Sequence, residues 1–104
     1  MEDVQLNMIT NEILDRTNVL KKCIKDSMTV GETYIIRGII CFEEVLKTIN
    51  PIEINDIVIE KIQMCVNDIL VKREIFSSYY MLGINKCYFI LYDYNIVNKK
   101  RKLG

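Results

Sequence analysis

Apolar residues recur every three or four positions in the first quarter of the chain, which is the spacing of one face of a helix. The pattern is interrupted at residues 15–18, which favour caps and turns. It therefore predicts a helix across 18–28 that is preceded by a second helical piece. The apolar residues that carry the pattern are Leu6, Ile9, Ile13, Leu20, Ile24 and Met28.

Another helix is predicted to begin at Thr29. Thr29 and Glu32 have the T-x-x-E form of a capping box, in which the hydroxyl and the carboxylate accept hydrogen bonds from backbone amides at the helix start. Pro51 ends the pattern, because proline cannot continue a helix. Between them lies a broad apolar face of Ile35, Ile36, Ile39, Ile40, Phe42, Val45, Leu46 and Ile49. The two helices should form an antiparallel hairpin, which is half of a four-helix bundle.

Two sources could supply the other half of that bundle. A second chain could provide it, since the combined apolar face is wider than one mutual contact consumes. Alternatively, residues 52–68 could form a third helix that closes the core within the chain. Asn55 would cap that helix, and its core positions would be Val58, Ile62, Cys65 and Ile69.

The composition changes after Ile69, because aromatic and β-branched residues dominate 69–97. Residues 83–86, Gly-Ile-Asn-Lys, have the composition of a tight turn, so two antiparallel strands are predicted. Both faces of this hairpin would be largely apolar and would need cover. The predicted fold is therefore α+β. It consists of a helical hairpin over 1–50, a connector or added helix over 51–68, a β-hairpin over 69–97 that a partner subunit completes into a β-barrel, and a basic tail over 98–104.

Length and charge restrict the possible partners. A chain of 104 residues forms one domain, and a hydrophobic content of 50% exceeds what so small a core needs, which suggests that a partner covers some of that surface. Fourteen basic and fourteen acidic residues cancel, which removes the bulk argument for a free-standing nucleic-acid binder or a membrane-surface protein. The apolar runs are also shorter than the roughly 20 residues of a membrane helix.

No residue pattern indicates catalysis or a cofactor. The cysteines are widely spaced and the chain has no histidine, so ordinary zinc spacing is missing and reduced, buried thiols are expected. Glu43 and Glu44 are adjacent, so on a helix they point about 100 degrees apart and are interpreted as surface charge rather than a catalytic pair. We therefore expect no enzyme, no small-molecule substrate and no membrane contact. The cysteines are Cys23, Cys41, Cys65 and Cys87.

Residues in three segments resemble one known family. The helix start at 17–20 is followed by Ile24 and Met28, and the second helix supplies Arg37, Ile39, Ile40, Phe42, Glu43 and Val45. The hairpin supplies Tyr80, Asn85, Phe89, Ile90, Leu91 and Asp93, with Cys87 where the family has a tryptophan. In this order, the segments resemble the small (gamma) subunit of general transcription factor IIA. The connector over 50–68 is longer than in that family, and the last strand of the family is missing or reduced to the short basic tail.

This resemblance implies a non-enzymatic nuclear subunit that acts in RNA polymerase II transcription. Its helices would join two helices of the large subunit of transcription factor IIA, and its strands would complete a β-barrel with that subunit. A strand edge of the barrel would lie beside the sheet of the TATA-binding protein, as in β-augmentation. The resemblance places the large-subunit interface at Leu20, Ile24, Ile35, Ile39, Phe42, Leu46, Phe89 and Leu91.

The resemblance also assigns the remaining contacts. Contact with the TATA-binding protein is expected at Tyr79, Tyr80, Asn85 and Cys87, with only one of the two tyrosines touching it because strand residues alternate in direction. Contact with promoter DNA phosphates is expected at Lys99, Lys100, Arg101 and Lys102, which could equally be a solvated tail or a nuclear-import patch.

An alternative function belongs to another class. The chain could be a small all-α protein–protein interaction adaptor, viral or host, in which residues 52–97 are helical. The excess of hydrophobic residues would then form a groove for a partner helix. The poor helix formers after residue 75 argue against this alternative.

Overall fold

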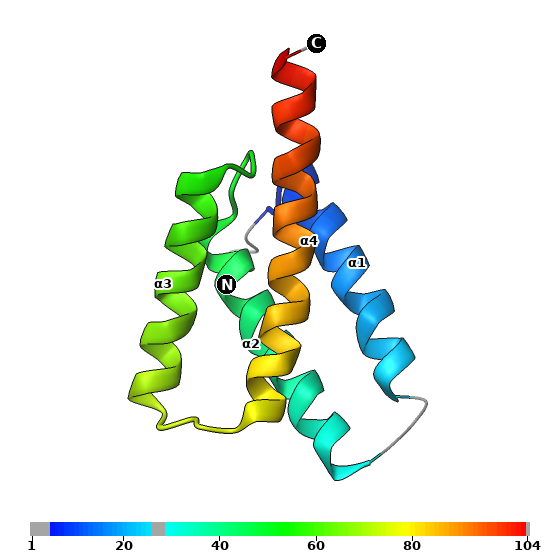
Figure 1. Ribbon diagram of the computed structural model, residues 1–104, viewed down its shortest axis with the longest axis vertical. Coiled ribbons are helices and arrows are strands. Elements are labelled where there is room, and N and C mark those ends of the chain that lie inside the picture. The colour runs from blue at the N-terminus through cyan, green and yellow to red at the C-terminus, as the bar shows by residue number, and fades with distance from the viewer. Residues whose placement is uncertain (1–4, 26–28, 104) are drawn as a thin grey trace.

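The described part of the chain folds into four helices. A computed structural model describes residues 5–25 and 29–103, which form α1 (Met8–Lys25), α2 (Val30–Ile49), α3 (Asp56–Lys72) and α4 (Ser78–Leu103) (Figure 1). No strand occurs in these two ranges. The predicted α+β fold is therefore wrong, because its β-hairpin and β-barrel are replaced by helix α4, and the fold is all-α.

Helix α4 forms where the hairpin was predicted because it buries a stripe of residues with helical spacing. Tyr80, Ile84, Cys87 and Leu91 follow steps of four, three and four residues, and all four side chains are buried. Gly83 lies within the helix rather than in a turn. Aromatic and β-branched residues favour strands only weakly, and burial of an amphipathic face contributes more to helix stability than local propensity does.

The predicted elements of the first half are partly confirmed. Helix α1 runs without a break through 15–18, so the predicted interruption is wrong, while Met28 lies outside the described residues. The helix start at Thr29 is confirmed, since its backbone N–H donates a hydrogen bond to the Glu32 carboxylate at 2.6 Å. The added helix is also confirmed as α3, where the Asn55 side chain accepts a hydrogen bond from the Val58 N–H at 2.9 Å. The chain therefore supplies both missing helices of the bundle itself.

The closest pair of helices is α2 and α4, which run in the same direction. A Cβ atom added at Gly38 would lie 2.1 Å from the Tyr80 carbonyl oxygen, and one added at Gly83 would lie 2.1 Å from the Ile35 carbonyl oxygen. The two backbones therefore touch at a reciprocal glycine contact. Beyond it, the rings of Phe42 and Tyr88 meet edge to face at 6.2 Å between centroids.

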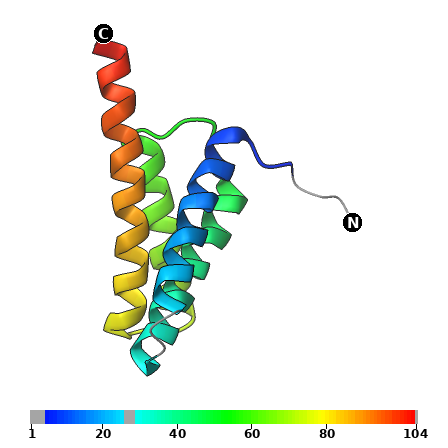
Figure 2. The ribbon, with the colours of Figure 1, turned by 90° about the vertical axis from the view of Figure 1, so that its right-hand side faces the viewer.

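This contact flattens the bundle. In an up-down-up-down bundle the second and fourth helices usually lie diagonally opposite each other, with core side chains between them. Here α2 and α4 are in direct contact instead. As a result, α1 and α3 lie on opposite sides of the α2–α4 pair and do not contact each other within the described ranges (Figures 1 and 2). One consequence is that α2 and α4 each keep an outer face that no other helix of the chain covers completely.

Two asparagines join the start of α1 to the end of α2. Asn50 ends α2 in the left-handed region, with φ of 46°. Its side-chain oxygen accepts hydrogen bonds from the Asn7 backbone N–H at 3.1 Å and from the Asn7 side-chain amide at 2.7 Å. The Asn7 oxygen in turn accepts from the Thr10 N–H at 3.0 Å, which caps α1.

A second polar contact fixes the far half of α4 to the start of α3. The Asn95 amide donates to Asp56 Oδ1 at 2.6 Å, and Lys99 Nζ lies 3.4 Å from Asp56 Oδ2. The hydrogen bond from Asn95, aided by Lys99, holds the pKa of Asp56 below its ordinary value. This contact therefore adds stability above the unfolded-state pKa of Asp56 and loses it as the pH falls through the lower folded-state pKa.

Two substitutions of Asn50 separate the contribution of its side-chain hydrogen bonds from that of its left-handed backbone conformation. Asn50→Gly keeps a residue suited to positive φ but removes the side-chain bonds to Asn7, so we expect the free energy of unfolding to fall by about 1–2 kcal/mol. Asn50→Ala should lose roughly 1 kcal/mol more, because alanine is strained at this φ. Urea denaturation followed by circular dichroism measures both changes. Asn18→Ala, on the exposed face of α1, is the control, and an Asn50→Gly protein as stable as the wild type would contradict this role.

Candidate functional site

Three adjoining cavities form one groove along the outer side of α2, bounded by α3 and by the α3–α4 connection. They have volumes of about 310, 230 and 320 Å³. The first and second share Glu44 in their walls, and the second and third share Arg37 and Tyr80. Because the walls are shared, we treat the cavities as a single α2–α3 groove.

The floor of the α2–α3 groove is mostly apolar. Ile40 is 41% exposed there, although it belongs to the broad hydrophobic face of α2. The groove exists because the glycine contact holds α2 tightly against α4, whereas α3 packs less closely on α2. The apolar side chains and thiols that line it are Ile40, Cys41, Val45, Ile49, Cys65, Ile69, Ile75 and Phe76.

Charges of opposite sign lie along the groove. Glu44 from α2 and Asp68 from α3, whose Oδ2 lies 2.9 Å from Lys72 Nζ, line the first cavity, while Arg37 from α2 and Arg73 from the end of α3 join Glu44 in the wall of the second. Seven residues separate the two α2 charges in the sequence, which corresponds to roughly 10 Å along a helix axis. The Arg37 guanidinium lies 5.4 Å from the centre of the Tyr34 ring, a cation–π contact that restricts its position.

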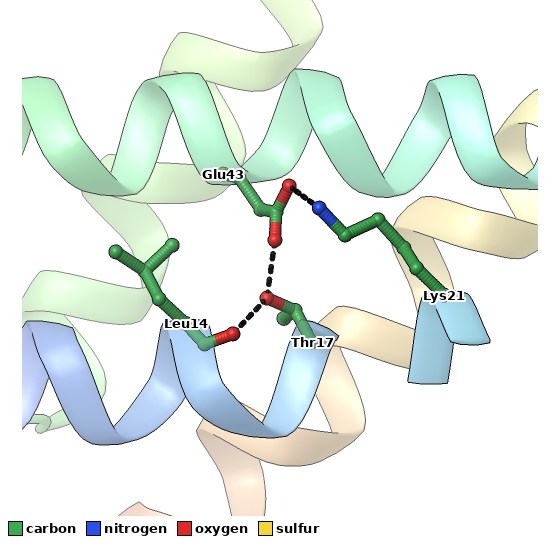
Figure 3. A network of polar contacts seen from close by, with 4 residues as sticks. All are labelled: Leu14, Thr17, Lys21 and Glu43. Atoms are coloured by element: carbon green, nitrogen blue, oxygen red, sulfur yellow. Dashed lines mark hydrogen bonds and ion pairs between the residues drawn. The ribbon is translucent and has the colours of Figure 1, made fainter. Parts of the chain in front are cut away.

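A separate polar cluster joins α1 and α2 inside the bundle (Figure 3). Glu43 is only 5% exposed, and its Oε1 lies 2.6 Å from Lys21 Nζ. The Thr17 hydroxyl lies 2.5 Å from Glu43 Oε2 and 2.9 Å from the Leu14 carbonyl oxygen. The interpretation of Glu43 as surface charge is therefore wrong, although Glu44 is exposed. Glu43 is buried and both of its carboxylate oxygens are bonded to α1, so the cluster links α1 to α2.

The residues predicted to contact the TATA-binding protein do not share a face. Tyr79 is 53% exposed and Asn85 is exposed, whereas Tyr80 and Cys87 are buried in the core. The alternation argument for the tyrosines no longer applies, because both lie in a helix. Burial raises the pKa of Tyr80 to about 12, with a further contribution from a hydrogen bond to Cys41. Burial, followed by the charge of Glu43, also raises the pKa of Cys87 to about 12, so this thiol stays protonated and shielded.

The predicted large-subunit interface lies mainly inside the chain. Ile35, Ile39, Phe42, Leu46 and Leu91 are buried in the protein's own core, and Leu20 and Ile24 are partly buried beside it. Phe89 is the exception, with 70% of its surface exposed.

The predicted phosphate-contact residues lie in the last turns of α4 rather than in a separate tail. The side chains of Lys99, Lys100 and Arg101 are exposed, and Lys102 belongs to the same helix. Lys99 is the one that reaches Asp56. These basic residues therefore continue helix α4 and do not form a separate tail.

Sequence reasoning did not assign the groove residues to a site. The signals were the excess width of the apolar face of α2, which includes Ile40, and the seven-residue spacing of Arg37 and Glu44. The opposite wall could not be placed, because the position of Asp68 and Arg73 depends on how α3 packs against α2.

Other kinds of site receive no support from the structure. No group of three or more potential ligands among His, Cys, Asp and Glu gathers anywhere in residues 5–25 and 29–103. Within the same ranges, none of the helices combines the length and apolar character that a membrane crossing requires. In comparisons with known proteins, the chain matches no family model, no curated protein and no solved structure.

Proposed function

We propose that this protein is an α-helical interaction module that binds an amphipathic helix of a partner protein in the α2–α3 groove. The observation that carries the proposal is a continuous groove with an apolar floor, in which the two arginines, Arg37 and Arg73, lie beyond the acidic Glu44 and Asp68. Helices commonly bind in this way, with apolar side chains at positions i, i+3 or i+4 and i+7 inserted into the groove.

The dimensions of the groove suit a short helix. Its walls extend along α2 from Ile49 to Tyr34, which corresponds to about 22 Å or four helical turns. Over that length a partner helix would place two or three layers of apolar side chains on the floor. Ile49 and Ile69 would contact the first layer, and Ile40 the next.

The charges define the chemistry of the partner. A lysine or arginine of the partner helix would face Glu44 and Asp68, and a glutamate or aspartate about seven residues away would face Arg37 and Arg73. Rim charges contribute more to the choice of partner and to the rate of association than to affinity. The proposed partner is therefore an apolar-striped helix with one basic and one acidic residue two turns apart.

The predicted transcription factor IIA function would act through a strand edge, and the described residues contain no strand. Addition of a strand to the sheet of the TATA-binding protein requires a strand edge, and residues 78–103 form a helix instead. Most of the proposed contacts to the large subunit are also occupied by the chain's own core. Nuclear localisation and promoter binding followed from that resemblance and remain predictions without structural support.

Fluorescence polarisation with designed helical peptides tests the proposed function. The probe is a labelled amphipathic peptide of about 18 residues, or five turns, with one lysine and one glutamate seven positions apart beside its apolar stripe. Two matched peptides carry lysine at both positions or glutamate at both. We expect the mixed peptide to bind most tightly, because it alone can complement both ends of the groove, by binding in the direction that places its lysine at Glu44 and its glutamate at Arg37. Arg37→Glu combined with Arg73→Glu should reverse the preference in favour of the two-lysine peptide, because acidic residues then line both ends of the groove.

Matched variants of the protein locate the binding site. Ile40→Glu places a charge on the groove floor at a partly exposed position and should weaken binding at least about 10-fold, or roughly 1.4 kcal/mol. Ile57→Glu is the control, because Ile57 is 78% exposed on α3 and lies outside the groove. Circular dichroism verifies that both variants fold. Equal binding by the two variants, or no binding of any peptide by the wild type, would rule out the groove as the site.

A further inference from the structure

Helix α4 is apolar on two opposite sides. One side packs against α2 through Tyr80, Ile84, Cys87 and Leu91. The other side exposes large apolar residues, which is unusual for the solvent-facing side of a helix. These are Leu82, Phe89, Tyr92 and Ile96, with exposed fractions of 44%, 70%, 40% and 54%.

The exposed residues follow the spacing of a coiled-coil seam. Together with two polar positions they form what we call the outer α4 stripe, with alternating steps of three and four residues: Leu82, Asn85, Phe89, Tyr92, Ile96 and Lys99. Such a repeat places every member along one line of the helix, where a second helix can pack against it. Figure 1 shows this helix in front of α2 and between α1 and α3, which do not meet, and its C-terminal turns extend beyond the other helices.

We propose that a second copy of this chain packs its α4 antiparallel along the outer α4 stripe, forming a symmetric dimer. A two-fold axis that passes between Phe89 and Tyr92 places Phe89 of each copy beside Tyr92 of the other. The two rings already meet edge to face within one chain, with centroids 6.4 Å apart. The dimer would therefore bring four aromatic rings together at the axis, where interface residues contribute most of the binding energy.

The charges beside the stripe complement themselves under this symmetry. Lys86 and Asp93 lie on the same side of the stripe, one before the axis and one after it. Lys86 of one copy therefore faces Asp93 of the second copy, and the pair occurs twice in the dimer. Lys86 forms no ion pair with any described residue, and the Asp93 side chain is 61% exposed although one of its oxygens lies 3.1 Å from Arg16. Its other oxygen remains available to the second copy.

A parallel arrangement would be opposed by charge. It would place each Lys86 near its own equivalent, each Asp93 near its own equivalent, and the basic residues 99–102 of both copies at the same end. Like charges in register disfavour association. The antiparallel arrangement moves the two basic ends to opposite ends of the dimer, and it is this self-complementarity that points to a second copy rather than to an unrelated helix.

Sedimentation equilibrium of the full chain over a range of concentrations tests the proposal. We expect a reversible monomer–dimer equilibrium, and Phe89→Glu should raise the dissociation constant about 100-fold or more, because it places two buried charges at the axis. Met64→Glu is the matched control, since Met64 is 65% exposed on α3 but lies outside both the stripe and the groove, and it should leave the dissociation constant within about threefold. A wild type that stays monomeric, or a dimer that Phe89→Glu does not weaken, would overturn the proposal.

A charge exchange tests the antiparallel register separately. Lys86→Glu alone and Asp93→Lys alone should each weaken the dimer, because each creates two like-charged pairs. An equimolar mixture of the two variants should restore dimers, since every pair between the different chains is then attractive. In a parallel dimer, Lys86→Glu would only replace one like-charged pair with another and leave the affinity unchanged. Failure of the mixture to associate more tightly than either variant alone would overturn the proposed arrangement.

Discussion

Replacing Gly83 with alanine is expected to lower the free energy of unfolding by roughly 3 kcal/mol, the upper end of the usual range for overpacking. The added Cβ would lie 2.1 Å from the Ile35 carbonyl oxygen, which is a backbone atom that cannot rotate away. The helices must therefore separate, and the core around Phe42 and Tyr88 loosens with them. A loss of stability would be informative, because alanine in place of a helical glycine normally stabilises a helix by about 1 kcal/mol.

Urea denaturation monitored by circular dichroism measures this change. Gly38→Ala should behave in the same way, because its Cβ would lie 2.1 Å from the Tyr80 carbonyl oxygen. Gly31→Ala is the matched control in α2. Its Cβ would meet only the ring of Tyr79, which is 53% exposed and can move, so the change should stay within about 1 kcal/mol. If Gly83→Ala were as stable as Gly31→Ala, the backbone contact would not be what holds α2 against α4.

Replacing Lys21 with methionine is expected to lower the free energy of unfolding by about 3 kcal/mol, as for other broken buried ion pairs. Methionine fills much of the same space but leaves the Glu43 carboxylate, whose side chain is 6% exposed, without its cation. The Thr17 hydroxyl alone cannot replace the charge. Lys22→Met is the control on the next position of α1, where the side chain is exposed, and it should change the stability by less than about 0.5 kcal/mol.

A double variant separates the cost of an unpaired charge from the value of the pair. Lys21→Met combined with Glu43→Leu removes both charges, so most of the lost stability should return, since apolar side chains often replace a buried ion pair without loss. Thr17 keeps the Leu14 carbonyl as a hydrogen-bond acceptor at 2.9 Å. The same denaturation measurement applies. A double variant that is less stable than Lys21→Met would mean that the ion pair itself stabilises the junction of α1 and α2.

The parts of the fold that could be predicted from the sequence depend on short-range chemistry. The starts of α2 and α3 follow from Thr29 with Glu32 and from Asn55, because a cap involves only residues within one turn. The supposed break in α1 was wrong for the opposite reason. Thr17 favours a cap or a turn in isolation, but here its hydroxyl donates a hydrogen bond to Glu43 of another helix, a partner that the local sequence does not reveal.

Helix α4 could not be predicted by the same means. Nearly every position in 79–92 is apolar or aromatic, so the run fits a period of two as well as one of 3.6 residues, and composition then favoured strands. Gly83 was assigned to a turn, although its role is to admit the backbone of α2. The helical spacing of Tyr80, Ile84, Cys87 and Leu91 was present in the sequence, but the equally apolar outer α4 stripe obscured it.

The sequence allowed the kind of site to be predicted, but not its location or the residues that line it. An all-α adaptor with a hydrophobic groove was among the alternatives, but the groove forms between helices whose separation is a tertiary property. The distance between α2 and α3 depends on the tight contact of α2 with α4, which the sequence expresses only as two glycines. No pattern within α2 or α3 alone reports which of their exposed charges face each other.

The glycine contact also constrains the order in which the chain can fold. The two helices with the most extensive contact, α2 and α4, are not neighbours in the sequence. All of α3 and its two connections lie between them. Closing so long a loop costs more chain entropy than joining neighbouring helices, and native contacts between distant residues slow folding. The hairpins α1–α2 and α3–α4 can form early, but the backbone-to-backbone crossing has to wait until the two halves dock. For a helical protein of this size, the rate-limiting step therefore depends on a long-range encounter rather than on local helix formation.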